Sequence, residues 1–364
     1  MAETDDQHVS TEAHRVPAED LTPEGPNGGA ILVEAMRDAG VEVAFGVISI
    51  HNIPLVEAID RDLRFVPVRH EAAAINAADA YARTSGRIGV ALTSTGTGAG
   101  NAAGAMLEAL TAGSRVLHVT GNIDSAHLGK DRGVYHEVPR QLEMLGTVSR
   151  HALRVESARR AGRTLAEAVH LLDGGGDRPA GPVSVDWPID LQYTADPARQ
   201  ARVPKKLRAA AAPEAATKRE ITRAARVLRK ARRPLIWAGG GTRSLASTAE
   251  GRRALVELAE HWGAGVLTGA AGRGAIPEDH PLLIGNFAVA EELAELIRDA
   301  DCLLTLGSHL RANETRSFEL PLASTHVQVD VDPEAPGRTY PVAQGIVADV
   351  RTVVPALLDR LGRV

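Results

Sequence analysis

The chain has 364 residues, enough for two ordinary domains, and 44% of them are apolar, so a sizeable core can form. The formal net charge is −5 with both signs interspersed, which excludes the basic footprint of a nucleic-acid binder. Aromatic residues make up only 3%, and alanine, glycine and valine do much of the filling, which suits helices that lie close to a sheet.

The single cysteine and the apolar runs bear on the cellular compartment of the protein. Cys302 has no second cysteine to pair with and lies in the apolar run ADCLLTLGS, so we expect a buried thiol and a reducing, cytoplasmic setting. No run reaches the roughly 18 to 20 apolar residues of a membrane span. Residues 1–27 are polar and acidic, without the apolar core of a signal peptide, and are predicted to form a disordered tail.

Helical and strand patterns alternate from residue 28 to residue 192. Asn52 is expected to cap a short helix that has Pro54 in its first turn. Strands such as GVALT and VLHVT are apolar throughout, which is typical of a parallel sheet covered on both faces. The predicted helices lie at 30–40, 52–62, 71–86, about 99–110 and 160–176, and the strands at 41–47, 64–68, 88–94, 114–121 and 181–188, with further segments at 141–148 and 151–155.

The alternation breaks between residues 193 and 217, where proline, alanine and charged residues predict an interdomain linker. It then resumes from 218 to 364. The fold class is therefore α/β, with two doubly wound parallel-sheet domains. In the second domain we predict helices at 218–231, 248–263, 290–300 and 350–362, and strands at 233–241, 264–269, 302–308 and 326–333.

Open parallel sheets bind ligands beyond the carboxyl ends of their strands, so the residues just after each strand are the informative ones. The segment TSTGTGAGN (93–101) places small, flexible residues before a helix expected to start near Ala99. Glycines there allow a ligand to approach the backbone closely. The segment has neither the spacing of a P-loop nor that of a dinucleotide fingerprint.

Glu71 follows the predicted strand FVPV and opens the alanine-rich helix EAAAINAADAYA. As a first-turn carboxylate it would interact favourably with the helix dipole, by about 0.3–1 kcal/mol. Covered by a partner surface over a wall of methyl groups, the same carboxyl would be desolvated and its pKa raised, as suits a catalytic acid. The spacing alone leaves both interpretations open.

Three histidines are candidate proton carriers near pH 7. His136 lies in the polar loop DRGVYHEVPRQ, which is a common place for functional residues. His51, in SIHNIP, and His70, beside Glu71, are the others. A lone histidine is more often structural, so each of them has that alternative.

Two features of the second domain have both a functional and a plain interpretation. Glycines 239–241 between a strand and a helix either hold a phosphate at the helix N-terminus or form a tight crossover. The segment EDH (278–280) looks like a metal motif. However, three adjacent residues of an extended chain cannot all face one ion, so we predict no metal ligands in this chain.

Taken together, the segments resemble thiamine diphosphate enzymes of the acetolactate synthase, pyruvate oxidase and benzoylformate decarboxylase type. In the family, a strand-end RHE is followed by an Ala/Gly-rich helix, a strand and a GPGATN-like turn. This sequence has the same order, and its turn reads GTGAGN (96–101). GPVSVDWPIDLQ (181–192) is similar to GPVxVDxPxDVQ, which closes the family's first domain, and GAIPEDHPLLIGN and VQVDVDP resemble its central domain. The resemblance runs from about Gly28 to Val364. It implies a pyrimidine-binding domain (28–192) and a Rossmann-like central domain (218–364).

The resemblance implies catalytic roles for two residues. The glutamate that matches Glu71 binds the N1′ atom of the cofactor's aminopyrimidine and helps that ring to remove the C2 proton of the thiazolium. VYHE (134–137) resembles the AFQE loop of acetolactate synthases, so His136 stands where the family has an active-site glutamine and could transfer protons. The positions implied to bind the cofactor are Glu71, Ile48, Ile50, Thr95, Gly96, Gly98 and Asn101.

Two departures from the family pattern bear on function. In GVISIHN (46–52), Ile48 and Ile50 replace small residues near the reacting carbon, which puts the acetolactate synthase reaction in doubt. The family's GDG…N motif, which holds Mg²⁺ and the diphosphate, does not occur in this sequence, and DGGGD (173–177) lies in the wrong place. The ligands of Mg²⁺ are therefore expected on a partner chain.

Two classes of function follow from the resemblance. The first is an enzyme subunit that acts on a 2-oxo acid, assembles as a homodimer or tetramer through its pyrimidine domain, and needs a separate diphosphate-domain subunit. The second is a non-catalytic or regulatory homologue that holds a nucleotide on its central domain. A truncated sequence is a third interpretation. Some family members carry FAD on the central domain and others do not, and these residues do not distinguish the two cases.

Overall fold

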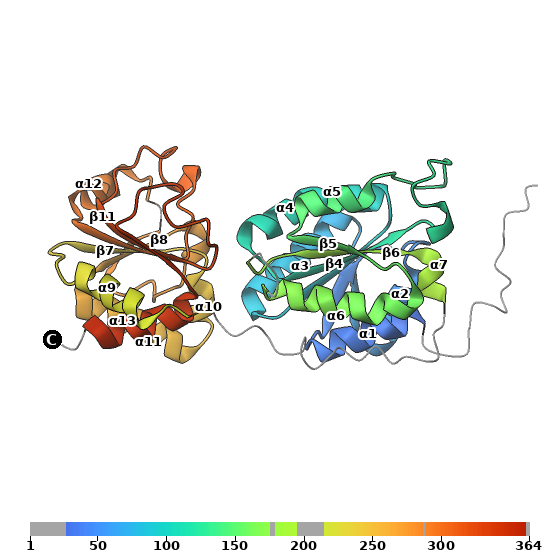
Figure 1. Cartoon of the computed structure of the whole chain (residues 1–364), viewed down its shortest axis with the longest axis horizontal. Helices are drawn as coiled ribbons and strands as arrows, with labels where there is room; N and C mark the ends of the chain where they lie inside the picture. Colours follow the sequence, from blue (N-terminus) through green and yellow to red (C-terminus); the bar gives the residue numbers. More distant parts are fainter. Residues whose placement is uncertain (1–26, 175–178, 195–214, 287, 362–364) are drawn as a thin grey trace, which may run out of the picture. The chain divides into compact units, whose positions relative to one another are not determined.

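The computed structural model describes residues 27–174, 179–194, 215–286 and 288–361. The chain forms two compact units, the first carrying α1 to α7 and the second α9 to α13 (Figure 1). Most of the predicted tail (1–27) and most of the predicted linker (193–217) lie outside the described residues. Within the described ranges, no helix combines the length and the apolarity that a membrane crossing requires.

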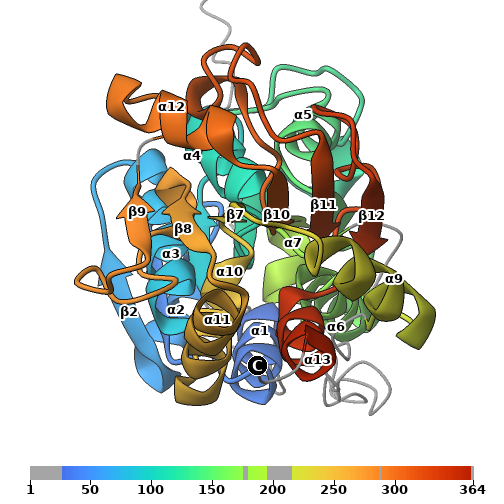
Figure 2. The ribbon, with the colours of Figure 1, turned by 90° about the vertical axis from the view of Figure 1, so that its left-hand side faces the viewer.

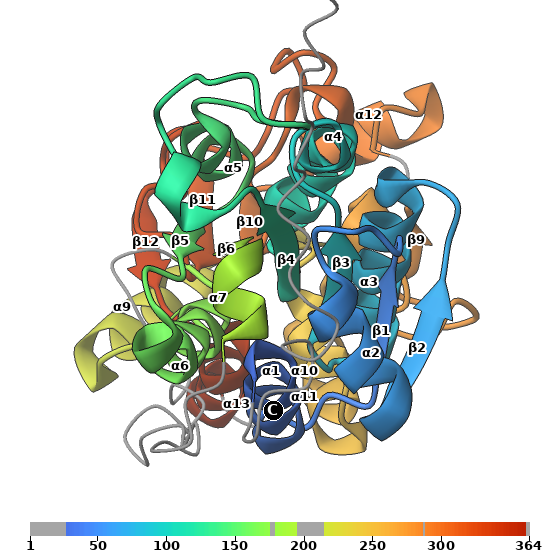
Figure 3. The same ribbon diagram turned by 90° about the vertical axis from the view of Figure 1, so that its right-hand side faces the viewer.

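The first unit is built on a six-stranded parallel sheet with the strand order β2-β1-β3-β4-β6-β5. Helices α1, α2 and α6 pack on one face of this sheet, and the alanine-rich α3 and α4, with α5, pack on the other (Figure 3). The elements are α1 (Gly28–Asp38), β1 (Val43–Gly46), α2 (Ile53–Asp62), β2 (Arg64–Pro67), α3 (Glu71–Ser85), β3 (Gly89–Thr93), α4 (Thr97–Ala112), β4 (Val116–Asn122), α5 (Gln141–Val148), β5 (His151–Arg154), α6 (Ala161–Leu172), β6 (Val183–Pro188) and α7 (Ile189–Tyr193).

The second unit repeats this architecture with the strand order β12-β11-β10-β7-β8-β9 (Figure 2). Helices α9, α10, α11 and α13 cover one face, and α12 covers the other. Cys302 is buried in this sheet, as predicted, and burial raises its pKa to about 12. The elements are α9 (Lys218–Leu228), β7 (Pro234–Ala238), α10 (Thr242–Ala246), α11 (Ala249–Trp262), β8 (Gly265–Thr268), β9 (Leu283–Gly285), α12 (Glu291–Asp299), β10 (Cys302–Leu306), β11 (Thr325–Asp330), β12 (Gln344–Val347) and α13 (Val350–Leu361).

Some local predictions were wrong. Helix α4 begins at Thr97 rather than near Ala99. Asn52 occupies the N-cap position of α2, but its side chain makes no cap. Its Nδ2 instead donates to the carbonyls of Val47 and Thr93, at 3.0 and 3.1 Å, and so ties the loop after β1 to the end of β3. The short strands β9 and β12 were not predicted.

Each sheet buries one neutral histidine beside a threonine of the neighbouring strand. Nε2 of His118 lies 2.8 Å from Oγ1 of Thr93, and Nε2 of His326 lies 2.9 Å from Oγ1 of Thr305. Burial lowers the pKa of His118 to about 4, and it lowers the pKa of His326 to about 4 as well. Both rings therefore stay uncharged at neutral pH, as a buried imidazole requires.

The first unit is expected to lose about 2–3 kcal/mol of unfolding free energy through His118 as the pH falls from 7 to 4.5. The unfolded histidine takes up a proton near pH 6.5, whereas the folded one does so only near pH 4, so acid favours the unfolded chain in this window. Urea titrations at the two pH values measure the loss. The variant His118→Gln keeps hydrogen-bonding groups but cannot titrate, and its loss should be smaller by that amount. An equal loss in both proteins would contradict the assignment.

Candidate active site at the switch point of the first sheet

The strand order of the first sheet reverses beside β1, which pairs with β2 on one side and with β3 on the other. The chain leaves the carboxyl ends of β1 and β3 toward helices on opposite faces of the sheet, and open α/β sheets bind ligands at such a point. Oγ of Ser49 and Oγ of Ser94 lie 2.6 Å apart and join the two loops. The candidate residues Glu71, Gly96, Gly98 and His136 gather around this place, as their contacts show.

Glu71 is the first residue of α3, and its side chain is only 8% exposed. Its Oε2 accepts a hydrogen bond from Nδ2 of Asn101 on α4, over 3.1 Å. The adjacent His70 caps the helix, because its Nδ1 accepts the backbone N–H of Ala72 at 3.2 Å. His70 therefore has a structural role, and Glu71 is a buried carboxyl held in place by an amide rather than a solvated charge at a helix start.

Two glycines at the start of α4, Gly96 at the N-cap and Gly98 in the first turn, stand where a side chain would clash with its neighbours. Gly96 has φ +58°, and a β-carbon there would overlap the carbonyl oxygen of His136. A β-carbon at Gly98 would lie 2.9 Å from Oε1 of Glu71 and 2.7 Å from Cβ of Ser94. The second carboxyl oxygen of Glu71 thus faces bare backbone.

His136 and His51 form a pair of imidazoles at the same end of the sheet. Their ring centroids lie 5.7 Å apart, and the ring of Tyr135 stacks on His136 at 4.0 Å. Nδ1 is buried in both histidines and has no hydrogen-bond partner among the described residues. Burial and then the neighbouring His136 lower the pKa of His51, while Asp124 opposes the shift. An imidazole pair of this kind can hold or pass a proton. The structure thus places His51 beside His136, the histidine that the resemblance implied to be catalytic.

The other predicted cofactor-binding residues are Ile48, Ile50 and Thr95. Ile48 and Ile50, in the loop after β1, are 61% and 63% exposed. The hydroxyl of Thr95 is buried and donates to Oε1 of Gln141 at 3.0 Å. The side chain of Thr95 is thus bonded within the protein, and only its backbone remains available to a ligand.

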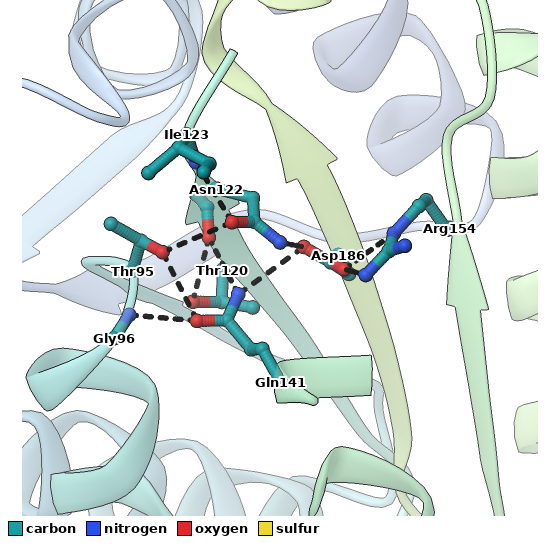
Figure 4. A network of polar contacts seen from close by, with 9 residues as sticks. Thr95, Gly96, Thr120, Asn122, Ile123, Gln141, Arg154 and Asp186 are labelled. Atoms are coloured by element: carbon teal, nitrogen blue, oxygen red, sulfur yellow. Dashed lines mark hydrogen bonds and ion pairs between the residues drawn. The ribbon is translucent and has the colours of Figure 1, made fainter. Parts of the chain in front are cut away.

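A buried polar network lies behind this turn (Figure 4). Asp186, within β6, is fully buried and accepts from Nε of Arg154 at 2.7 Å and from Nδ2 of Asn122 at 2.8 Å. Nε2 of Gln141 donates to the same carboxylate at 3.2 Å. Burial raises the pKa of Asp186, and the Arg154 cation and the amide donors oppose that shift.

Sequence reasoning missed this network. Asn122, Gln141, Arg154 and Asp186 come from four different elements, and no local pattern places them together. The one signal that could have found it is Asp186 itself, a charged residue inside the otherwise apolar strand GPVSVDWP. A buried carboxylate needs partners, so its presence predicts a polar cluster at the strand end.

The switch point of the second sheet lies between β7 and β10, where the glycine turn 239–241 packs against the loop after β10. The Cβ that Gly241 lacks would lie 2.8 Å from Cα of Gly307, and the one that Gly239 lacks would overlap Ser308. The glycine turn therefore forms a tight crossover, and the phosphate interpretation of glycines 239–241 has no support here. His280 of the EDH segment lies 3.3 Å from Glu260.

The chain is an α/β protein of two doubly wound domains, the first with a buried carboxyl at the switch point, which is where such sheets bind ligands. Residues 26–144 match the family model of the N-terminal TPP binding domain of thiamine pyrophosphate enzymes. Residues 221–357 match the model of the central domain of the same enzymes. The two matches cover more than half of the chain, which therefore belongs to the thiamine pyrophosphate enzyme family, as predicted.

Several known proteins resemble this chain. The protein named Probable 2-ketoarginine decarboxylase AruI, of Pseudomonas aeruginosa, is 32% identical over 344 residues, which cover 92% of this chain and 58% of the relative. The Probable acetolactate synthase large subunit of Methanocaldococcus jannaschii is 29% identical, covering 92% of this chain and 56% of the relative. This chain thus spans little more than half the length of these relatives.

The fold also has a counterpart among solved structures. The X-ray structure of a protein from Mycobacterium smegmatis, described as thiamin diphosphate-dependent, superposes with a TM-score of 0.78. The superposition covers 93% of this chain and 63% of that one at 21% sequence identity. It confirms the prediction of two doubly wound parallel-sheet domains.

Proposed function

We propose that this chain forms the pyrimidine-binding half of a thiamine diphosphate-dependent enzyme that decarboxylates a 2-oxo acid. In this proposal a separate diphosphate-domain subunit holds Mg²⁺ and the diphosphate. The observation that carries it is the buried carboxyl of Glu71 at the switch point, with one oxygen bonded to Asn101 and the other facing Gly98. Family membership gives the class of cofactor.

The residues around Glu71 fit an aminopyrimidine ring. A carboxyl can exchange a hydrogen bond with a ring nitrogen, and the missing side chain at Gly98 keeps a β-carbon from crowding Oε1. Asn101 fixes the plane of the carboxyl, and burial limits competition from water. Glu71 would hold the proton at the ring nitrogen, as a positioned general acid does. When bound, thiamine diphosphate supplies a carbon nucleophile and takes up the electrons left by carbon dioxide.

We further propose that the product is released as an aldehyde rather than condensed with a second 2-oxo acid. Ile48 and Ile50 extend apolar side chains from the loop after β1, where family members have small residues. This bulk would occupy space that a second substrate needs. The names of the relatives include both reactions, a decarboxylase and acetolactate synthases, so the choice is open to experiment.

The chain, mixed with the diphosphate-domain polypeptide, is expected to release carbon dioxide from one or more 2-oxo acids only when thiamine diphosphate and Mg²⁺ are present. A panel that includes pyruvate, benzoylformate and a 2-oxo acid with a basic side chain tests the substrate, and mass spectrometry of the products separates aldehyde from acetolactate-type acids. The chain alone should be inactive. Absence of cofactor-dependent release with every partner and substrate would contradict the proposal.

Homodimers or tetramers formed through the first unit, in the cytoplasm, are part of the same proposal. Gly100 and Gly104 lie on the exposed side of α4, where a β-carbon would meet nothing within 4 Å. Leu107, one turn further, is 47% exposed. Such a face allows a second copy to pack closely, and sedimentation of the purified chain measures whether it does.

A further inference from the structure

We propose that Gln141 is a positioning residue for the active site: its buried amide, oriented by Asp186, holds the turn 95–96 so that α4 presents Gly98 and Asn101 to Glu71. Gln141 is 1% exposed and begins α5. None of its hydrogen bonds reaches Glu71 directly. The importance of Glu71 in this inference rests on the proposed function.

The orientation of the Gln141 amide is fixed by the groups around it. Its Nε2 donates to two acceptors, the carbonyl oxygen of Gly121 at 3.0 Å and Oδ1 of Asp186 at 3.2 Å. Its Oε1 accepts from two donors, the N–H of Gly96 at 2.7 Å and the hydroxyl of Thr95 at 3.0 Å. A flipped amide would set donors against donors and acceptors against acceptors. Because the Asp186 carboxylate can only accept, it holds Nε2 on its own side, and Oε1 therefore faces residues 95–96 (Figure 4).

The first turn of α4 is built on the two residues that Gln141 holds. The N–H of Gly98 donates to the carbonyl of Thr95 at 3.0 Å, and the N–H of Gly100 donates to the carbonyl of Gly96 at 2.9 Å. Gly98 lies against Oε1 of Glu71, and Asn101 donates to Oε2. A displacement of residues 95–96 is thus passed to both oxygens of the carboxyl.

Gln141 also ties this turn to the loop that carries His136. That loop ends where α5 begins, at Gln141, and the carbonyl oxygen of His136 lies directly over Gly96. The turn is therefore held from one side by the amide and packed from the other by the loop. The Gln141 side chain accordingly fixes how the loop with His136 lies relative to the turn beside Glu71.

The inference is tested at the Glu71 carboxyl itself, without cofactor or substrate. In protein labelled with ¹³C at the glutamate carboxyl, the Glu71 signal is the one that Glu71→Gln removes. Gln141→Met takes away the amide at nearly constant volume, and Gln141→Asn withdraws it by one methylene. Both variants should change the ¹³C chemical shift of the Glu71 carboxyl at pH 7, because the carboxyl loses its hydrogen bond from Asn101. Should Gln141→Met fail to fold, Gln141→Asn carries the test alone.

Gln328 offers a matched control in the second unit. It is also 1% exposed and also joins two loops, donating to the carbonyl of Ser308 and accepting the N–H of Gly337, each at 3.0 Å. Gln328→Asn should leave the ¹³C chemical shift of the Glu71 carboxyl unchanged. An unchanged carboxyl signal in the Gln141 variants, or an equal change in Gln328→Asn, would overturn the inference.

The activity assay separates this inference from the proposed function. In the reconstituted protein, Gln141→Asn should lower kcat about tenfold with little change in KM for the 2-oxo acid. If the unmodified protein shows no cofactor-dependent activity, the proposed function fails, while the carboxyl chemical shift still decides the role of Gln141. A loss of kcat without a change of the Glu71 carboxyl signal would count against positioning.

Discussion

Replacing Glu71 by glutamine should lower kcat/KM of the reconstituted protein by about 10²–10⁴-fold, the usual contribution of a positioned general acid or base. Glutamine has the same shape as glutamate, and its carbonyl oxygen can still accept the Asn101 hydrogen bond. It cannot give and take a proton at the ring nitrogen. The loss should therefore appear in activity, while the free energy of unfolding changes by no more than about 1 kcal/mol.

Steady-state rates and urea titrations of the Glu71→Gln protein measure both quantities. Glu167→Gln is a suitable control, because Glu167 is an exposed carboxylate on α6 and should be replaceable without loss of activity. If Glu71→Gln retains the activity, the carboxyl is not catalytic. The non-catalytic, regulatory interpretation of the chain would then be favoured.

Replacing Gly98 by alanine should reduce kcat/KM by about 100-fold, because a misplacement of about 1 Å at a reacting group has effects of this size. The new β-carbon would lie 2.9 Å from Oε1 of Glu71 and 2.7 Å from Cβ of Ser94, so the carboxyl and the turn must move apart. The added crowding should also cost about 1–3 kcal/mol of stability. A crystal structure of the variant would show whether the Glu71–Asn101 hydrogen bond survives.

Gly146→Ala provides the matched comparison. Gly146 lies within α5, and a β-carbon there would meet only Cβ of Ala152, at an ordinary 4.0 Å. This variant should gain about 0.5–1 kcal/mol, because alanine is the better helix former. It should keep its activity. Equal behaviour of Gly98→Ala and Gly146→Ala would show that the space beside Glu71 is not needed.

The fold was largely predictable because each element carries its own pattern. Apolar strands such as β3 and β4 alternate with helices of helical periodicity, and this alternation has few solutions other than a parallel sheet covered on both faces. Glu71 and Gly98 were predictable for the same reason, since residues that follow a strand gather at one edge of such a sheet. The family resemblance then selected them among the other loop residues.

Contacts between distant segments were not predictable. The bond from Gln141 to Gly96 joins residues 45 apart in sequence, and it depends on the orientation that Asp186 gives to the amide. The closed glycine turn at 239–241 depends on Gly307, a partner that no local pattern indicates. The pairing of His51 with the ring of His136 was not predicted, because the two residues are far apart in sequence. In each case the decisive partner is set by the strand order.

The central claim is that Glu71 and its surroundings activate thiamine diphosphate. Its most direct test is the rate at which deuterium from the solvent replaces the C2 proton of the bound cofactor, followed by acid quench and NMR in the reconstituted protein. We predict exchange faster than for the free cofactor by orders of magnitude, and a return toward the free rate in Glu71→Gln. Exchange at the free rate in the unmodified protein, or equally fast exchange in Glu71→Gln, would contradict the account.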